Sequence, residues 1–302
     1  MKKLRFLIAS PSYNHRTAGV MVLHELCDML NRQGHEAAMV LFGGVGPCFQ
    51  WAYSNQPGHY HPQHRRIDLS MEDTAKSVRD FLEDGVVIYP DLVPDNPLNA
   101  KRVVRYLLYK NHSYVAQNAD EYVLSFSQVF HDAPNSYLFK TFLSEELNAK
   151  GSRHWEDRTL DITYFGKGPN FTNCHLIPGT VALSRTWPED KAQLGELLRQ
   201  CRYFFTWDSV SQTNVDAVAC GAIPIVLQDK QASREELGRG ELGRFPLLQL
   251  TNLLDKTSVD GDVTAVNTCV EYMNQCIAHY QTTWPSRVNE FALSADQFFH
   301  FS

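Results

Sequence analysis

Two carboxylates and a lysine between glycines are the residues best suited to chemistry on a phosphate-bearing substrate. Asp208 and Asp216 are separated by seven residues, and Lys167 stands between Gly166 and Gly168. Lysine supplies a compact positive charge, and glycine lets a phosphate approach the backbone closely. We therefore expect an anion-binding site where the fold brings these residues together.

The segment around the two aspartates predicts a strand, a helix and a second strand. Tyr203–Trp207 is a short unbroken apolar run, typical of a buried parallel strand. Ser211 can cap the helix that follows, Gly221 is suited to end it, and Ile223–Leu227 predicts the next strand. The amides and dipole of a helix N-terminus favour an anion. The alternative is an ordinary strand–helix–strand unit with one capping and one solvent-facing aspartate.

The second half of the chain is expected to begin just before the glycine–lysine–glycine segment. Residues 148–157 are polar and are the best linker candidate, so we expect one domain over residues 1–150 and another over 151–302. A strand at 161–165 then runs directly into Gly166. Arg185 precedes a helix expected to start at 186–189, and two further helices are expected at 266–280 and 284–301.

The first half opens with a strand, a loop, a helix and a second strand. The loop, residues 11–19, contains His15, Arg16 and Gly19, and it lacks the glycine spacing of a dinucleotide-binding fingerprint, which leaves a dehydrogenase without support at this place.

A strand at 85–89 is expected next, followed by a loop with Asp91 and Asn96. We expect a basic helix at 99–109, which includes Lys101 and Arg105. Its charges indicate either a solvated face or an anionic acceptor. His131 follows a further strand at 122–127, at the strand end that delivers side chains to a ligand.

Composition places the chain among globular proteins. It has 302 residues, 43% hydrophobic and 21% charged, which suffices for two domains of common size. No apolar run approaches the ~20 residues that span a bilayer. Seven cysteines without a CxxC pair suggest free thiols in a reducing compartment, so a cytoplasmic location is expected.

Charge is distributed unevenly along the chain. Residues 1–150 carry 15 Lys/Arg against 16 Asp/Glu, a net −1, and the remaining 13 against 18 give −5. This balance does not indicate a generally basic nucleic-acid-binding protein, although local basic clusters in the first half remain compatible with it.

The segment from Asp208 to Val226 resembles the donor-binding signature of retaining, two-domain Rossmann-type (GT-B) glycosyltransferases. In that family two carboxylates flank seven residues, and the helix ends in a cysteine–glycine pair before a strand, as Ala219–Val226 does here. The run from Tyr89 to Leu108, "YPD…NPL…VVRYLL", resembles a segment of bacterial and phage members. Two departures are visible: both acids are aspartate where glutamate is usual, and residues 209–211 replace a glycine-rich turn.

The resemblance implies an α/β fold of two Rossmann-like domains facing a cleft, with the C-terminal helix crossing back to the first domain. It also assigns roles to residues of both halves. The implied catalytic residues are Asp208, Lys167 and His131; the donor-binding residues are Gly19, Gly166, Gly168, Arg185, Ser209, Val210, Ser211 and Asp216; the acceptor-side residues are His15, Arg16, Asp91, Asn96, Lys101 and Arg105.

The implied activity is transfer of a sugar from a nucleotide-sugar donor, with retention and without metal or cofactor, and a UDP-sugar is the preferred donor. The acceptor implied by default is a surface polysaccharide or glycan. A phage-type enzyme acting on hydroxymethylated DNA bases is one alternative, and a non-catalytic nucleotide-sugar or glycan-binding module is another. A sugar-nucleotide epimerase fits the carboxylate spacing less well.

A cluster of histidines supplies the one metal-site hypothesis in the sequence. His59, His61 and His64 have a spacing that can bind a metal, but no cysteine or carboxylate nearby completes a set. A surface loop is the preferred interpretation.

Overall fold

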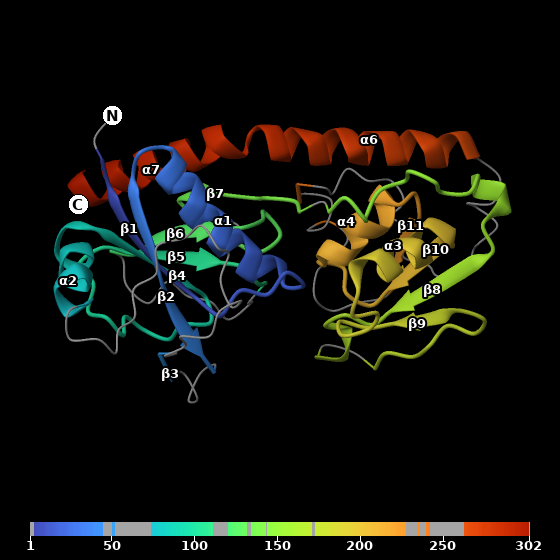
Figure 1. Cartoon of the computed structure of the whole chain (residues 1–302), viewed down its shortest axis with the longest axis horizontal. Coiled ribbons are helices and arrows are strands. Elements are labelled where there is room, and N and C mark those ends of the chain that lie inside the picture. Colours follow the sequence, from blue (N-terminus) through green and yellow to red (C-terminus); the bar gives the residue numbers. More distant parts are fainter. Residues whose placement is uncertain are drawn as a thin grey trace. The chain divides into compact units, whose positions relative to one another are not determined.

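The computed structural model of the chain describes residues 3–44, 50–51, 74–110, 120–131, 134–142, 144–170, 173–227, 235, 240–241 and 263–301. Its backbone divides into two compact units (Figure 1). Unit 1 comprises residues 1–140 together with 283–302, and unit 2 comprises residues 141–282. The last helix therefore belongs to unit 1, as the expected fold class requires. The chain passes from one unit to the other shortly before the polar stretch at 148–157.

Unit 1 contains, in its described part, a seven-stranded sheet. Its order is β3-β2-β1-β4-β5-β6-β7, and all neighbouring pairs are parallel except β2 with β3. The strands are β1 (Arg5–Ser10), β2 (Glu36–Gly43), β3 (Gln50–Trp51), β4 (Val86–Pro90), β5 (Val103–Leu107), β6 (Tyr122–Ser125) and β7 (Ser136–Tyr137). Strands buried on both faces read as continuous apolar runs, which is why β1, β2 and β4 were recognisable in the sequence.

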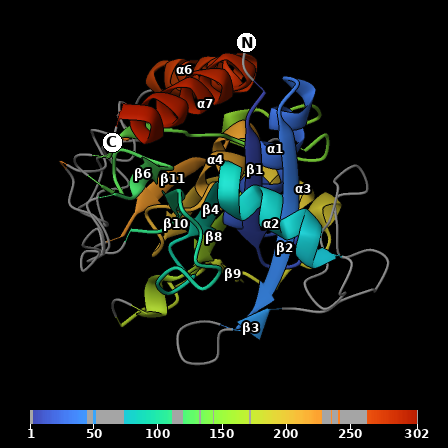
Figure 2. The same ribbon diagram turned by 90° about the vertical axis from the view of Figure 1, so that its left-hand side faces the viewer.

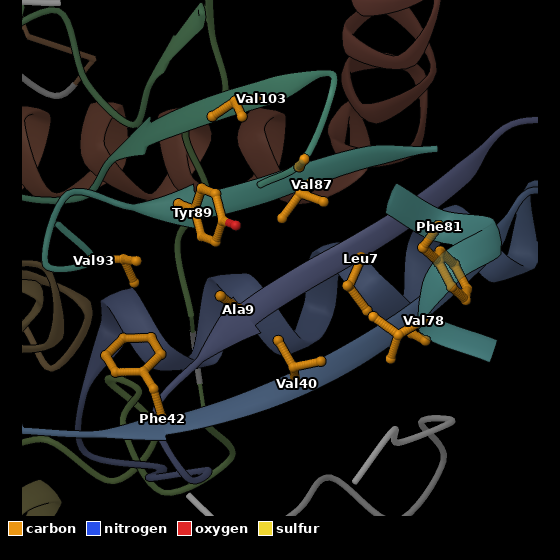
Figure 3. Packing of buried hydrophobic residues seen from close by; sticks show 12 residues of the cluster. Leu7, Ala9, Val40, Phe42, Val78, Phe81, Val87, Tyr89, Val93 and Val103 are labelled. Carbon is orange, nitrogen blue, oxygen red and sulfur yellow. The ribbon is translucent and has the colours of Figure 1, made fainter. Parts of the chain in front are cut away.

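Among the described residues of unit 1, three helices pack beside this sheet: α1 (Ala18–Arg32), α2 (Thr74–Asp84) and α7 (Trp284–Phe301) (Figure 2). One face of the central strands packs against α2 in a cluster that Figure 3 shows. It includes Leu7, Ala9, Val40, Phe42, Val78, Phe81, Val87 and Tyr89. The alternate residue Phe6 instead contacts Phe291 of α7 (ring centroids 6.1 Å apart), as expected for side chains that alternate between the faces of a strand.

The expected helix at 99–109 is wrong. Residues 103–107 form β5, a fully buried strand that pairs with β4 through Val104↔Ile88 and with β6 through Val104↔Tyr122. Two β-branched valines begin the segment, and its aromatic and apolar residues suit a strand that is covered on both faces. Pairing on both sides therefore prevails over the weak helical spacing.

The described part of unit 2 is built around a four-stranded parallel sheet with the order β11-β10-β8-β9. The strands are β8 (Leu160–Tyr164), β9 (Val181–Leu183), β10 (Cys201–Thr206) and β11 (Ile223–Val226). The helices are α3 (Lys191–Gln200), α4 (Gln212–Ala219) and α6 (Val263–Thr282), with short 3₁₀ turns at Trp155–Asp157 and Gly168–Asn170. Helix α3 begins later than expected, because Asp190 caps it by accepting from the Ala192 amide at 3.1 Å.

Candidate anion-binding site in unit 2

The strand order of unit 2 reverses between β8 and β10. From β8 the chain goes to β9 on one side and then to β10 on the other side of β8. Tyr164 at the end of β8 lies level with Leu183 of β9 and Thr206 of β10. Ligands of open α/β sheets bind outside the carboxyl ends of the strands at such a reversal. The loops after β8 and β10 are therefore the candidate site.

The loop after β8 closes directly around Asp208. The amide of Lys167 donates to Asp208 Oδ2 at 2.9 Å, and Lys167 Nζ lies 3.9 Å from Asp208 Oδ1 and 3.4 Å from the Val210 carbonyl oxygen. Only 1% of Asp208 is exposed, whereas the Lys167 side chain is 24% exposed. Lys167 is thus the member of this pair that a ligand can reach.

Close packing explains why positions 166 and 168 of this loop are occupied by glycine. Gly166 has φ +53°, a left-handed conformation, and a side chain there would collide with Asp208. A Cβ on Gly168 would lie 2.6 Å from both Cβ and the carbonyl oxygen of Trp207. We expected these glycines to give a phosphate access to the backbone; around Gly166, Asp208 already occupies the space next to the chain.

A network of polar side chains fixes the turn between β10 and α4. Ser211 is the N-cap of α4 and accepts from the Thr213 amide at 3.3 Å, as predicted, and its hydroxyl lies 3.2 Å from the Tyr164 hydroxyl. The side-chain amide of Asn214 donates to the carbonyl oxygens of Asp208 (2.9 Å) and Ser209 (3.2 Å). The turn of residues 208–211 therefore holds the N-terminus of α4 beside the β8 loop, where the helix dipole favours negative charge.

Asp216 lies within α4 and is only 7% exposed. Burial raises the pKa of its carboxyl to about 7, although a hydrogen bond from Gln212 and the charge of Lys191 act in the opposite direction. Gln212 Nε2 donates to Asp216 Oδ1 at 3.1 Å and to the Phe142 carbonyl oxygen at 3.0 Å. Gln212, Tyr164 and Asn214 were missed by sequence reasoning. Their positions at a strand end and in the first turn of the helix were the available signal.

Arg185 completes the positive side of this edge. It is exposed on the loop after β9, two residues beyond Leu183, and its charge acts on the buried hydroxyl of Tyr164. Burial is the main reason that the pKa of Tyr164 is raised, followed by the charge of Asp208. The structure thus brings together, at one edge of one sheet, the predicted residues Gly166, Lys167, Gly168, Arg185, Asp208, Ser209, Val210, Ser211 and Asp216.

Predicted acceptor-side residues in unit 1

Unit 1 has a reversal of its own, between β1 and β4. His15 and Arg16 are exposed on the loop after β1, and Gly19 lies in the first turn of α1. A Cβ on Gly19 would make only ordinary contacts, the nearest at 3.6 Å from Leu108. Asp91 directly follows β4, and burial raises its carboxyl pKa to about 6, with backbone hydrogen bonds acting against this effect. The order of the strands therefore supports this edge as a second ligand-facing region.

Asn96 organises the loop after β4. It accepts from the Tyr89 hydroxyl at 3.1 Å and from the Ala100 amide at 3.0 Å, and it donates to the Ala100 carbonyl oxygen at 2.8 Å. Its polar groups are thereby used within the loop. At His131, the backbone carbonyl accepts from the Tyr137 hydroxyl at 3.1 Å, and a role for its ring stays a prediction.

The expectation that Arg105 lies on an exposed basic helix is wrong. Its guanidinium is buried in the sheet, 3.1 Å from Glu121, and it donates at 2.7 Å to the carbonyl oxygens of Val93 and Asp95. It also lies over the Tyr89 ring at 5.3 Å. Lys101 is exposed as expected. The hydrogen-bonding groups of the Arg105 guanidinium are thus satisfied inside unit 1 by a carboxylate and two carbonyl oxygens.

His59, His61 and His64 lie outside the described residues. Among the residues that are described, no group of three or more His, Cys, Asp or Glu side chains could hold a metal ion. No helix in the described ranges is long and apolar enough to cross a membrane.

Comparison with known proteins finds similarity only among solved structures. No family model and no curated protein matches the chain. The glycosyltransferase SnogD from Streptomyces nogalater is 14% identical over 97% of this chain and 100% of its own, with a TM-score of 0.47. CalG4, the calicheamicin glycosyltransferase, is 14% identical over 97% and 98%, with a TM-score of 0.45.

An alpha-glucosyltransferase solved with UDP and a 13-mer DNA containing an HMU base is also similar. It is 10% identical over 95% of each chain, with a TM-score of 0.41. Each of these matches extends over nearly the whole chain, at a TM-score below 0.5. At these identities the similarity says nothing about individual residues of the site.

Proposed function

We propose that the chain is a glycosyltransferase that uses a nucleotide-sugar donor and binds the donor diphosphate at the carboxyl edge of unit 2. The observation that carries the proposal is the meeting of the Lys167 loop, the Asp208 turn and the N-terminus of α4 at the strand-order reversal. A cation and a helix N-terminus at one place suit a diphosphate. A simple strand–helix–strand unit does not require a lysine between two glycines at this place.

In the proposed reaction, the bond between the anomeric carbon and the diphosphate oxygen breaks, and a bond to an acceptor oxygen forms on the same face. The departing diphosphate gains negative charge, which Lys167 Nζ and the α4 amides stabilise in place. The acceptor hydroxyl passes its proton to the departing diphosphate oxygen as its own oxygen bonds to the sugar. Asp208 acts as a positioning residue in this scheme, because its carboxylate holds the Lys167 amide and is almost fully buried.

Asp216 has a second proposed role, the binding of the ribose hydroxyls. Its carboxyl lies in the same helix, one turn from Gln212, which orients it. Since burial raises its pKa to about 7, the neutral and ionised forms coexist near neutral pH. Ribose binding through the ionised form then strengthens as the pH rises through about 7.

We further propose a glycan acceptor and a reaction that needs no metal ion. Of the cations in the run 101–110, Arg105 and Lys110 are buried, with 3% and 5% exposure. The surface there is therefore less basic than the sequence suggests, which disfavours a DNA acceptor. Lys167 and the dipole of α4 supply the positive charge that a bound metal ion supplies in metal-dependent enzymes. Activity should therefore survive EDTA.

The test is donor binding and donor hydrolysis without acceptor. We would screen UDP, GDP, dTDP and ADP by thermal stabilisation, since a ligand at ~100 times its Kd adds ~2.7 kcal/mol. The matching UDP- or other nucleotide-sugar is then assayed for slow release of free sugar, with and without EDTA. Binding with no hydrolysis and no transfer would favour the non-catalytic module, and binding of no nucleotide would overturn the proposal.

A further inference from the structure

Gln212 is the first residue of α4, and its side chain reaches two acceptors at once. Its Nε2 donates to Asp216 Oδ1 at 3.1 Å and to the Phe142 carbonyl oxygen at 3.0 Å. A carbonyl oxygen and an ionised carboxylate can only accept, so the NH₂ group, with its two hydrogens, must face both of them. The side-chain amide of Gln212 is therefore fixed from two sides.

These contacts differ from an ordinary pair on a helix surface. A glutamine and an aspartate four residues apart often form such a pair in solvent, but Asp216 is only 7% exposed. Among the described residues, Gln212 is the side chain that hydrogen-bonds to this carboxyl. The second anchor, Phe142, lies outside the helix, in the segment by which the chain enters unit 2 at residue 141. A segment distant in sequence thus helps to set the direction in which Gln212 holds the carboxyl.

We propose that Gln212 is a positioning residue that holds Oδ1 of Asp216 and so turns Oδ2 toward the ribose hydroxyls of the donor. The inference rests on the proposed function, which places the ribose at Asp216. Gln212 does not itself touch the donor in this scheme. It orders the carboxyl in advance, which reduces the entropy lost on binding, and it favours the ionised form, which makes the stronger hydrogen bonds.

The selectivity of binding for ribose tests this role. The probes are the best-binding member of UDP, GDP and ADP, its 2′,3′-dideoxy counterpart, and inorganic pyrophosphate, all measured by calorimetry. Wild type should bind the ribonucleotide more tightly than the dideoxynucleotide. Gln212→Met keeps the length of the side chain and removes both donors. It should weaken ribonucleotide binding about 10-fold and leave the affinities for the other two ligands unchanged.

Two further variants show whether the effect passes through Asp216. In an Asp216→Asn background, which should itself lose most of the preference for ribose, adding Gln212→Met should change the preference no further. Gln200→Met is the matched control, because Gln200 is an exposed glutamine of the same unit whose Nε2 donates to the Glu196 carbonyl oxygen at 3.2 Å. It should leave all three affinities unchanged.

The surroundings of Asp216 are simple enough for its titration to be followed. Among the described residues, Lys191 of α3 is the charged group that acts on it, and the nearby thiol of Cys220, whose burial raises its pKa to about 12, stays protonated. The elements β10, β11 and α6 pack against α4 through apolar residues such as Phe205, Ile225 and Ile277.

The pH profile is a readout that a purely structural role would not move. The ratio of ribonucleotide to dideoxynucleotide affinity is followed from pH 5 to pH 9, because titration of the phosphates affects both ligands alike. In wild type this ratio should rise through about pH 7, where Asp216 ionises. A hydrogen bond to an ionised carboxyl lowers its pKa, so Gln212→Met should raise the pKa of Asp216 and move the rise to higher pH.

The outcomes distinguish this inference from the proposed function. If Gln212→Met weakens all three ligands equally, or keeps the wild-type preference and pH profile, the positioning proposal is wrong and the proposed function stands. If wild type binds the ribonucleotide and the dideoxynucleotide equally, Asp216 does not hold the ribose and the positioning proposal falls with that role, whereas the diphosphate site stands. If no nucleotide binds the wild-type chain, both proposals fail together.

Discussion

At the residue scale, Lys167 and Asp208 are in direct contact, and the buried aspartate holds the loop that presents the partly exposed lysine. Because Lys167 Nζ is proposed to stabilise charge on the departing diphosphate, Lys167→Ala should lower kcat about 10²–10³-fold, the range for losing one preorganised charge-stabilising group. Steady-state kinetics of transfer or donor hydrolysis measure this. Lys150→Ala, which removes an exposed lysine of the same unit, should have wild-type kinetics. Unchanged kinetics in Lys167→Ala would remove Lys167 from the site.

The raised pKa of Asp216 predicts how the stability of the chain depends on pH. Its pKa is raised to about 7 in the folded chain, above its value of roughly 3.9 in the unfolded chain, so folding favours the protonated form. The folded state then binds more protons between about pH 4 and pH 7, and stability falls as the pH rises through this window. Asp216→Asn should therefore be more stable than the wild type at pH 8, by on the order of 1–3 kcal/mol.

Thermal denaturation at pH 5 and pH 8 measures this difference. At pH 5 the wild-type carboxyl is protonated and resembles the amide, so the two proteins should melt at nearly the same temperature. Asp190→Asn is a matched control, because Asp190 is exposed and caps α3. A difference between wild type and Asp216→Asn that is the same at both pH values would contradict the raised pKa.

The proximity of Lys167, Asp208 and Asp216 was easier to predict from the sequence than the burial of each side chain. The types and spacing of Lys167, Asp208 and Asp216 predicted one site, and parallel pairing of β8 with β10 does bring their loops to one edge. The burial of Asp208 was not predictable, because it depends on the contact between Gly166 and Asp208 across two strands. Spacing within a sequence carries no information on which polar group faces its neighbour and which faces solvent.

At the scale of elements, the loop after β8 depends on Gly166. Gly166→Ala introduces two costs: a left-handed backbone with a side chain, about 1–2 kcal/mol, and displacement of Asp208. We expect a larger loss of unfolding free energy than for Gly151→Ala, together with weaker nucleotide binding. Gly151 separates the two effects, since it has φ +78° and no atom within 4 Å of an added Cβ. Equal losses and unchanged binding would show that the contact with Asp208 is not needed.

Strand β5 shows where element prediction failed and what followed from it. The sequence suggested a basic helix over residues 99–109, whereas parallel partners on both sides make residues 103–107 a central strand. Non-local pairing of this kind cannot be inferred from a window of sequence. Arg105 consequently changes from an expected ligand contact to a buried partner of Glu121.

The buried pair predicts a stability effect in unit 1. Arg105→Ala leaves Glu121 buried without its guanidinium and should cost about 3–5 kcal/mol of unfolding free energy. Lys101→Ala, at an exposed position two residues before the strand, should change stability by less than about 0.5 kcal/mol. Chemical denaturation of both variants provides the comparison. A mild effect of Arg105→Ala would mean that Glu121 finds another partner or becomes protonated at little cost.

At the scale of the whole molecule, much of the architecture could be predicted. The two α/β halves and their parallel strands followed from short apolar runs that alternate with helices. The family resemblance predicted that the last helix returns to the first domain. In the structure, contacts hold α7 in unit 1: the Tyr122 hydroxyl donates to the Ser294 hydroxyl at 2.9 Å, and Phe291 packs against Phe6 and Tyr122. Such contacts span most of the chain length, and no local pattern encodes them.

The net charge of −6 bears on the acceptor, and this gives the last prediction. A DNA-modifying enzyme must neutralise phosphates, so its DNA affinity falls steeply with salt, with a slope of about −0.9 for each phosphate contacted. Because Arg105 is buried, the exposed cations left among the predicted acceptor-side residues are Arg16 and Lys101. We therefore expect no duplex DNA binding at 150 mM salt and transfer to a glycan that is insensitive to salt. Titration of labelled duplex with hydroxymethylated bases at low and high salt measures this. Arg16→Glu with Lys101→Glu is the decisive variant: transfer to DNA that depends on salt and is lost in this variant, while donor hydrolysis is retained, would replace the glycan with DNA as the acceptor.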